Sequence, residues 1–246
     1  MNVLMIGNCA SVGWNLTQGL RKKNINVVFV GNSSKCISGR YDCHLSWRDF
    51  LQKGYGKKHF DIIHIHSPNF KKLGLVWRYL NSKDTKLVCH WHGSDLRIFR
   101  KTFPIHWLLK KIAVYHLYST IDLAWWLRSI DKSKKQLFRC PVDIDLFKPN
   151  GNKKNGLLIL LGGAKTSIPI LHDYMSEHIN NFGKLQVYPA YGLSEKLLQV
   201  SMMEGAACGL NVINHSWINR DWVINNASIE SQTKKLINIY NEVLKK

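Results

Sequence analysis

Short apolar runs alternate with polar turns along the chain, and this alternation predicts its secondary structure. Apolar, strand-like runs occupy Asn2–Ile6 and Asn26–Val30, and a segment with helical spacing lies between them at 14–23. A strand, a helix and a second strand within about thirty residues are typical of a βαβ unit with a right-handed crossover. Further buried strands are predicted at 61–65 and Lys86–Trp91, so we expect a parallel sheet with helices on both faces.

A break in this alternation predicts a domain boundary. Residues 147–156 contain one proline, two glycines and three asparagines, a composition that does not form a packed element. A new strand-like run follows at Leu157–Leu161, and we place the boundary at about residue 150. The remaining predicted elements are helices at 70–81, 103–118, 122–129, 168–181, 195–207 and from about 230, and strands at 185–188 and 211–214. The sequence therefore predicts an α/β fold of two facing Rossmann-like domains with parallel sheets, over residues 1–150 and, in abbreviated form, 151–246.

Charge is distributed unevenly between these two parts. The chain of 246 residues holds 35 Lys+Arg against 16 Asp+Glu, a formal net charge of +19. Residues 1–150 account for +16 of this charge and contain no glutamate, whereas residues 151–246 account for +3. The first domain is therefore expected to meet an anionic partner, which can be a nucleic acid, a lipid surface or a phosphorylated substrate.

Composition excludes several classes of protein. With 45% hydrophobic and 21% charged residues, the chain is neither disordered nor a disulfide-stapled mini-protein. Its six cysteines are scattered without a CxxC pair, no signal peptide is visible, and no apolar run is long enough to span a bilayer. We expect free thiols and a cytoplasmic protein that is soluble or bound at the inner membrane surface.

Two pairs of histidines lie where predicted strands end, and they carry the candidate chemistry. The pairs are His64-Ile-His66 and His90-Trp-His92, and the second continues as Gly93-Ser94-Asp95. Because residues i and i+2 of a strand share a face, each pair can present two imidazoles together. Ligands of open α/β sheets bind outside the carboxyl ends of the strands, so we expect a site that contains His92, Ser94 and Asp95, joined by His66.

Two other interpretations of these histidines remain open. His64 and His90 can equally be buried structural residues. The two pairs together could supply four nitrogen ligands to the metal of a hydrolase. Such a hydrolase usually needs bridging carboxylates as well. Residues 1–150 contain few acidic side chains, so we expect no metal site.

Four segments in order resemble the retaining glycosyltransferases of the GT-B fold, in the glycogen-synthase-like class known as glycosyl transferases group 1. The segments are Asp61-Ile-Ile-His64-Ile-His66-Ser-Pro, His92-Gly-Ser-Asp95, Pro141-Val-Asp143-Ile-Asp145-Leu-Phe147-Lys-Pro149 and Glu204-Gly-Ala-Ala-Cys-Gly209. The third looks like the family's exit from its first domain. Asp143 and Asp145 also form the DxD pattern that binds a divalent ion in the other glycosyltransferase fold, but a linker position favours a structural role.

The resemblance implies donor-binding residues. The family's glutamate at the position of Glu204 hydrogen-bonds the nucleotide ribose, although a solvated helix glutamate is the plainer interpretation. Lys165 matches a lysine that contacts the donor diphosphate, and Glu195 lies one residue from the position of a glutamate that contacts the sugar. The turn from Gly7 to Gly13 brings backbone and a helix N-terminus toward an anionic group, although a simple turn explains it as well.

The function implied is transfer of a sugar from a nucleotide-sugar donor to an acceptor glycan or lipid-linked acceptor. The resemblance implies retention of anomeric configuration, no metal and no cofactor beyond the donor, with His92 and Asp95 at the reacting centre. A second hypothesis is a non-catalytic relative that binds a nucleotide-sugar or a membrane within a complex. Lys196 at the sugar-contacting position, the absence of the family's diphosphate-binding arginine and the short second domain favour this alternative.

Basic and aromatic residues are interleaved at 70–78 and 97–111. This mixture suits an anionic bilayer surface, where cations meet head groups and aromatic rings sink between them. The same charges could bind nucleic acid, but no RNA- or DNA-binding motif is recognisable, so nucleic acid is not the expected partner. A third interpretation is a basic helix that is exposed to solvent and buries only one stripe of apolar residues.

Overall fold

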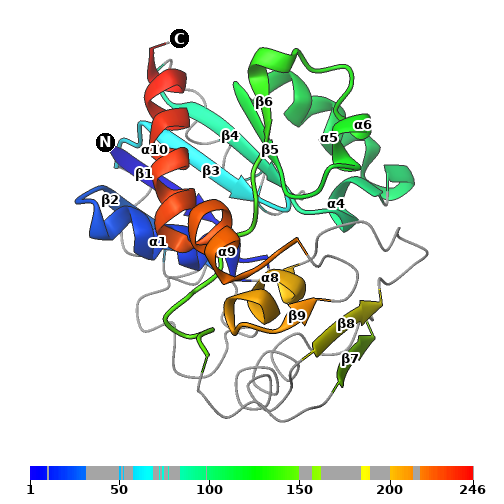
Figure 1. Ribbon diagram of the computed structural model, residues 1–246. Coiled ribbons are helices and arrows are strands. Elements are labelled where there is room, and N and C mark those ends of the chain that lie inside the picture. Colours follow the sequence, from blue (N-terminus) through cyan, green and yellow to red (C-terminus); the bar gives the residue numbers. More distant parts are fainter. Residues whose placement is uncertain are drawn as a thin grey trace. The chain divides into compact units, whose positions relative to one another are not determined.

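The chain divides into two units in the computed structural model (Figure 1). Unit 1 comprises Met1–Arg139 and Thr233–Lys246, and unit 2 comprises Cys140–Gln232. The sequence placed this boundary at about residue 150 and kept the whole terminal helix in the second domain. The structure describes residues 1–9, 11–31, 50, 52, 58–68, 72, 74, 77, 84–97, 99–149, 157–161, 184–188, 200–212 and 217–245.

Unit 1 is built, in its described part, on a six-stranded sheet of order β2-β1-β3-β4-β5-β6. Every neighbouring pair is parallel, which confirms the predicted α/β class. The strands are β1 (Asn2–Ile6), β2 (Asn26–Val30), β3 (Ile62–His66), β4 (Lys86–Trp91), β5 (Tyr115–Tyr118) and β6 (Lys135–Leu137). The helices are α1 (Val12–Lys22), α4 (Ser94–Arg97), α5 (Phe99–Ile112), α6 (Leu123–Trp126), the 3-10 turn η3 (Lys132–Lys134) and the later part of α10 (Ile229–Leu244).

The two faces of this sheet differ in chemistry because successive strand residues point to opposite sides. One side, which we call the apolar face, belongs to the hydrophobic core together with Leu109 of α5 and Leu123 of α6. Its residues from β3 and β4 are Ile63, Ile65, Leu87, Cys89 and Trp91. The opposite side, which we call the histidine face, carries His64, His66 and His90, all fully buried.

The prediction of a helix over 103–118 was wrong in its second half. The structure ends α5 at Ile112 and forms strand β5 from Tyr115 to Tyr118. The amide of Val114 donates to the carbonyl oxygen of Leu87, which begins the pairing of β5 with β4. The spacing of apolar residues in this segment also fits a helix, but its tyrosines favour a strand. Pairing with the buried strand β4 outweighs the helical preference.

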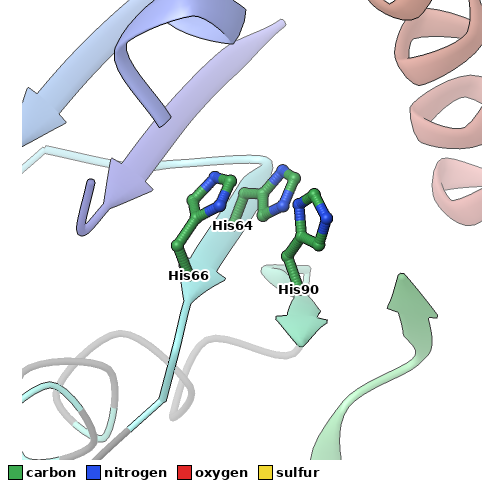
Figure 2. Close-up of side chains that lie close together, drawn as sticks. All are labelled: His64, His66 and His90. Carbon is green, nitrogen blue, oxygen red and sulfur yellow. The ribbon is translucent and has the colours of Figure 1, made fainter. Parts of the chain in front are cut away.

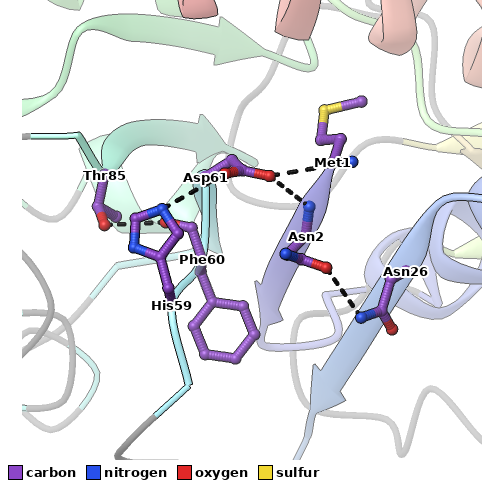
Figure 3. A network of polar contacts seen from close by, with 7 residues as sticks. All are labelled: Met1, Asn2, Asn26, His59, Phe60, Asp61 and Thr85. Atoms are coloured by element: carbon purple, nitrogen blue, oxygen red, sulfur yellow. Dashed lines mark hydrogen bonds and ion pairs between the residues drawn. The ribbon is translucent and has the colours of Figure 1, made fainter.

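Polar contacts fasten the amino ends of the central strands (Figure 3). The Asp61 carboxylate accepts from the backbone amide of Asn2 at 2.6 Å, and the Asn26 side-chain amide donates to the Asn2 side chain at 2.9 Å. The Thr85 hydroxyl, just before β4, donates to the carbonyl oxygen of Phe60 at 2.8 Å. The paired side chains at this end are therefore structural, and the candidate site lies at the other end of the strands.

Unit 2 contains, among its described residues, a three-stranded parallel sheet of order β7-β8-β9. Its strands are β7 (Leu157–Leu161), β8 (Lys184–Tyr188) and β9 (Asn211–Val212), and its helices are α8 (Val200–Ala207), α9 (Arg220–Ala227) and the start of α10. The Arg220 guanidinium donates to the carbonyl oxygens of Phe147 and Ala207, which joins the linker to α8 and α9. The helix predicted at 168–181 lies outside the described residues.

None of the helices that the structure describes has the length and apolar character needed to cross a bilayer.

Candidate functional site

The four histidines of the two pairs stack into one cluster. The ring centroids of His64 and His66 are 4.5 Å apart, and those of His90 and His92 are 4.2 Å apart. His66 also stacks on His92 across the two strands, at 5.2 Å. Figure 2 shows three of these rings side by side at the ends of β3 and β4. The expected pairing of imidazoles within each strand is therefore present.

A chain of hydrogen bonds fixes the tautomers of three of these rings. His66 Nε2 lies 3.1 Å from the Met5 sulfur, which can only accept, so this nitrogen carries the hydrogen. His66 Nδ1 then accepts from His92 Nε2 at 2.9 Å. The Ser119 hydroxyl donates to His92 Nδ1 and accepts from His90 Nε2, each at 3.1 Å. This direction of donation leaves His90 Nδ1 as a bare lone pair, and it has no hydrogen-bond partner.

His64 has a different partner. Its Nδ1 lies 2.6 Å from the hydroxyl oxygen of Tyr240, which belongs to the later part of α10. Its Nε2 is buried and without a hydrogen-bond partner. Burial raises the pKa of Tyr240 well above its usual value of 10, so the phenol keeps its proton.

All four imidazoles are neutral at pH 7. Burial, followed by repulsion from His92, lowers the pKa of His64 to about 3. Burial, followed by repulsion from Lys72, lowers the pKa of His92 to about 3. The pKa values of His66 and His90 are also well below 6.5, first because of burial and then because of the neighbouring imidazoles. Neutral rings keep lone pairs available for hydrogen bonds or for a metal.

Asp95 holds the loop that follows β4. Its carboxylate accepts from the backbone amides of His92 at 3.0 Å, Gly93 at 2.7 Å and Leu96 at 3.0 Å. Gly93 has a φ of 134°, in the region that favours glycine. Burial raises the pKa of Asp95, and the backbone hydrogen bonds oppose that shift. Asp95 therefore fixes the backbone at His92, and Ser94 begins the short helix α4 beside it.

The turn from Gly7 to Gly13 lies at the carboxyl end of β1. Gly7 has a φ of 87°, and a Cβ on Gly13 would clash with the Gly7 carbonyl oxygen, so both positions require glycine. Lys72 lies against this turn and donates to the carbonyl oxygens of His66 at 2.5 Å and Ser67 at 2.9 Å. Burial lowers the pKa of Lys72. The sequence analysis missed Lys72, although it is one cation of the basic segment 70–78.

The remaining predicted site residues belong to the second half of the chain. Glu204 lies on α8 in unit 2 and is only 7% exposed, so it is not the solvated helix glutamate of the plainer interpretation. Lys165 and Glu195 lie outside the described residues. The structure therefore brings together His66, His92, Asp95 and the Gly7–Gly13 turn in unit 1, and it adds Lys72, Ser119 and Tyr240 to them.

Comparisons with known proteins give a likeness of fold. No protein-family model matches the sequence, and no curated protein matches it. Among solved structures, the chain is similar to AviGT4, a glycosyltransferase involved in avilamycin A biosynthesis, with a TM-score of 0.64 and 10% identity over 100% of this chain and 98% of that one. CalG4, the calicheamicin glycosyltransferase, aligns with a TM-score of 0.45 and 8% identity over 99% of this chain and 91% of that one. The likeness to AviGT4 confirms the predicted GT-B-like fold class.

Proposed function

We propose that this chain is a glycosyltransferase that moves a sugar from a nucleotide-sugar donor to an acceptor. The observation that carries the proposal is the likeness of fold to AviGT4, itself a glycosyltransferase, over essentially the full length of both chains. The site geometry agrees with it, because the polar side chains of unit 1 gather at the carboxyl ends of β1, β3 and β4, where α/β sheets bind ligands.

We assign His92 to the reacting centre. It is the one member of the histidine cluster that is half-buried rather than fully buried. Its ring is neutral at pH 7, and His66 and Ser119 hold it in a single orientation. Asp95 acts as a positioning residue, because its carboxylate is occupied by the backbone amides of the loop that carries His92.

Donor binding is assigned to Glu204, together with Lys165 and Glu195 and the glycine turn at Gly7 and Gly13. The burial of Glu204 supports a role other than that of a solvated surface residue. We further propose that transfer retains the anomeric configuration and needs neither metal nor another cofactor, because protein cations and helix N-termini stabilise the leaving diphosphate. We assign this role in unit 1 to Lys72, a half-buried cation beside the glycine turn.

A membrane-surface acceptor fits the exposed face of α5 and α6. Trp107 and Trp125 are 52% and 58% exposed, and a cation covers each ring, Lys111 at 3.8 Å and Arg128 at 3.9 Å. Exposed tryptophan beside cations is typical of proteins that bind anionic bilayers. We therefore propose a lipid-linked or membrane-surface acceptor and a cytoplasmic protein that associates with the inner membrane surface.

The first test is thermal unfolding of the full chain against a panel of nucleoside diphosphates and nucleotide-sugars, with EDTA present. A ligand at about 100 times its dissociation constant adds about 2.7 kcal/mol of stability, which raises the melting temperature by several degrees. A shift with one base class identifies the donor. The absence of any shift contradicts the donor site.

The second test is turnover of the donor that this panel identifies. His92→Ala is expected to lower transfer at least about a hundredfold while donor binding is kept, and the exposed His59→Ala serves as control. Unchanged turnover in His92→Ala would remove His92 from the site. Nucleotide binding by the native chain without turnover on any acceptor would favour the non-catalytic relative.

A further inference from the structure

The buried interior of the histidine face contains polar atoms that no hydrogen bond satisfies. His64 Nε2 and His90 Nδ1 are both without a partner, on rings that are fully buried. The two ring centroids are 5.5 Å apart, and Figure 2 shows nitrogens of the two rings turned toward one another. Buried polar atoms in native proteins nearly always have a partner, so a ligand for these nitrogens is expected.

We infer that His64, His66 and His90 form a binding site for a transition-metal dication of the Zn²⁺ class. One nitrogen from each ring lies within 4.8 Å of the other two. A zinc–nitrogen bond of about 2.1 Å in tetrahedral geometry separates its ligand nitrogens by about 3.4 Å, so the rings must close inward by about an ångström. Two of the three donors, His64 Nε2 and His90 Nδ1, lose no hydrogen bond when they bind the ion.

The opposite nitrogen of each ring already has a partner. His64 Nδ1 meets the Tyr240 hydroxyl, and His90 Nε2 meets the Ser119 hydroxyl. His66 Nδ1 meets His92 Nε2. Histidines that bind metal characteristically donate their other N–H to such a partner, which orients the ring and raises its basicity. His90 already has this tautomer, and His64 has it when its Nδ1 donates to the Tyr240 oxygen. His66 reaches it when its Nδ1 donates to His92 Nε2. His92 Nδ1 then donates to the Ser119 oxygen, which can accept from both His90 and His92.

A second geometric adjustment is required besides the inward movement of the rings. The rings of His64 and His66 are nearly parallel, 9° apart, so their lone pairs do not converge until one ring turns. The terminal torsion of histidine is broad, and the group that touches His66 Nε2 is the flexible thioether of Met5. That thioether is itself a soft ligand, which adds affinity for softer ions.

Ligand chemistry defines the ion. The cluster offers imidazole nitrogen and a thioether but no carboxylate, and this set suits zinc, copper, nickel or cobalt rather than magnesium or calcium. The ion would link β3 to β4, and through Tyr240 would brace α10, so its role is structural. The inference does not rest on the proposed transferase activity, which is expected to continue without metal.

Metal titration of the chelator-treated full chain tests the inference. One equivalent of Co²⁺ is expected to give the visible ligand-field bands of a four-coordinate site without a thiolate charge-transfer band, and Zn²⁺ should displace it. Zn²⁺ should also raise the melting temperature. A native chain that takes up neither ion, or whose Co²⁺ spectrum shows thiolate ligation, overturns the inference without any variant.

Two variants locate the site. His64→Gln and His90→Gln are each expected to weaken Zn²⁺ binding at least about a hundredfold, with folding checked by circular dichroism. His116→Gln is the matched control, since His116 is a buried histidine on the apolar face of the same sheet. Equal affinity in His64→Gln, His90→Gln and the native chain would assign the metal to another place and overturn the inference.

Discussion

The two faces of the unit 1 sheet use the same strands for opposite purposes. Ile63 and Ile65 of β3 point into the apolar core, whereas His64 and His66, one residue along, lie among polar partners. The apolar face requires mainly volume and hydrophobic surface, so many sequences could build it. The histidine face requires a donor to meet an acceptor at every buried nitrogen, and stability is lost wherever a partner is missing. Local folding rules are typically broken at functional sites, so the histidine face is where we expect function.

The largest expected effect comes from breaking the apolar face at Trp91. This ring is fully buried, and its Nε1 donates to His116 Nδ1 at 3.2 Å. Trp91→Ala is expected to lower the free energy of unfolding by about 3–5 kcal/mol, because it leaves a large cavity and removes a buried donor. Urea denaturation measures the loss. Destabilisation below about 1 kcal/mol would show that Trp91 does not support the core.

A smaller loss is expected from breaking the hydrogen-bond chain of the histidine face. Ser119→Ala removes one hydroxyl that serves both His90 and His92. The expected cost is about 1–3 kcal/mol, because two nitrogens lose their partner while little volume is lost. The exposed Ser129→Ala is the control, with an expected change within about 0.5 kcal/mol. Equal stability of the two variants would mean that the chain of hydrogen bonds contributes nothing.

The smallest expected effect is a pH dependence from His116 on the apolar face. Burial, and then repulsion from Lys110, lowers its pKa from 6.5 to about 3. Between these pH values the unfolded chain binds the proton and the folded chain does not, so stability falls as the pH falls, by at most about 1.4 kcal/mol per pH unit. Denaturation at pH 7 and pH 5 should show a smaller loss in His116→Gln than in the native chain. Identical losses, or a ring that titrates near pH 6.5 by NMR, would contradict this.

The core of the site could be predicted because its signal is local. Spacing i, i+2 places His64 beside His66 and His90 beside His92, and the end of a parallel strand places them at the ligand-binding edge. The same local logic predicted β1 and β2 with the bounds that the structure gives them.

The partners of the histidines could not be predicted, because they come from remote segments. Tyr240 lies 176 residues from His64 along the chain, and Ser119 follows β5, which helical spacing had concealed. Asp95 was expected at the reacting centre, but no sequence pattern indicates that three backbone amides occupy its carboxylate. Likewise, no sequence pattern indicates that Lys72 donates to the carbonyl oxygens of His66 and Ser67.

Helix α10 determines when unit 1 can be completed during protein synthesis. The helix starts in unit 2, yet its later part, with Tyr240, belongs to unit 1. The strands of the histidine face leave the ribosome long before Tyr240 is translated, so His64 lacks its partner throughout the synthesis of unit 2. Contacts so distant in sequence form slowly, and the nascent chain meanwhile exposes unfinished sheet surface. The order of translation therefore makes the packing of the later part of α10 a late step in the folding of unit 1.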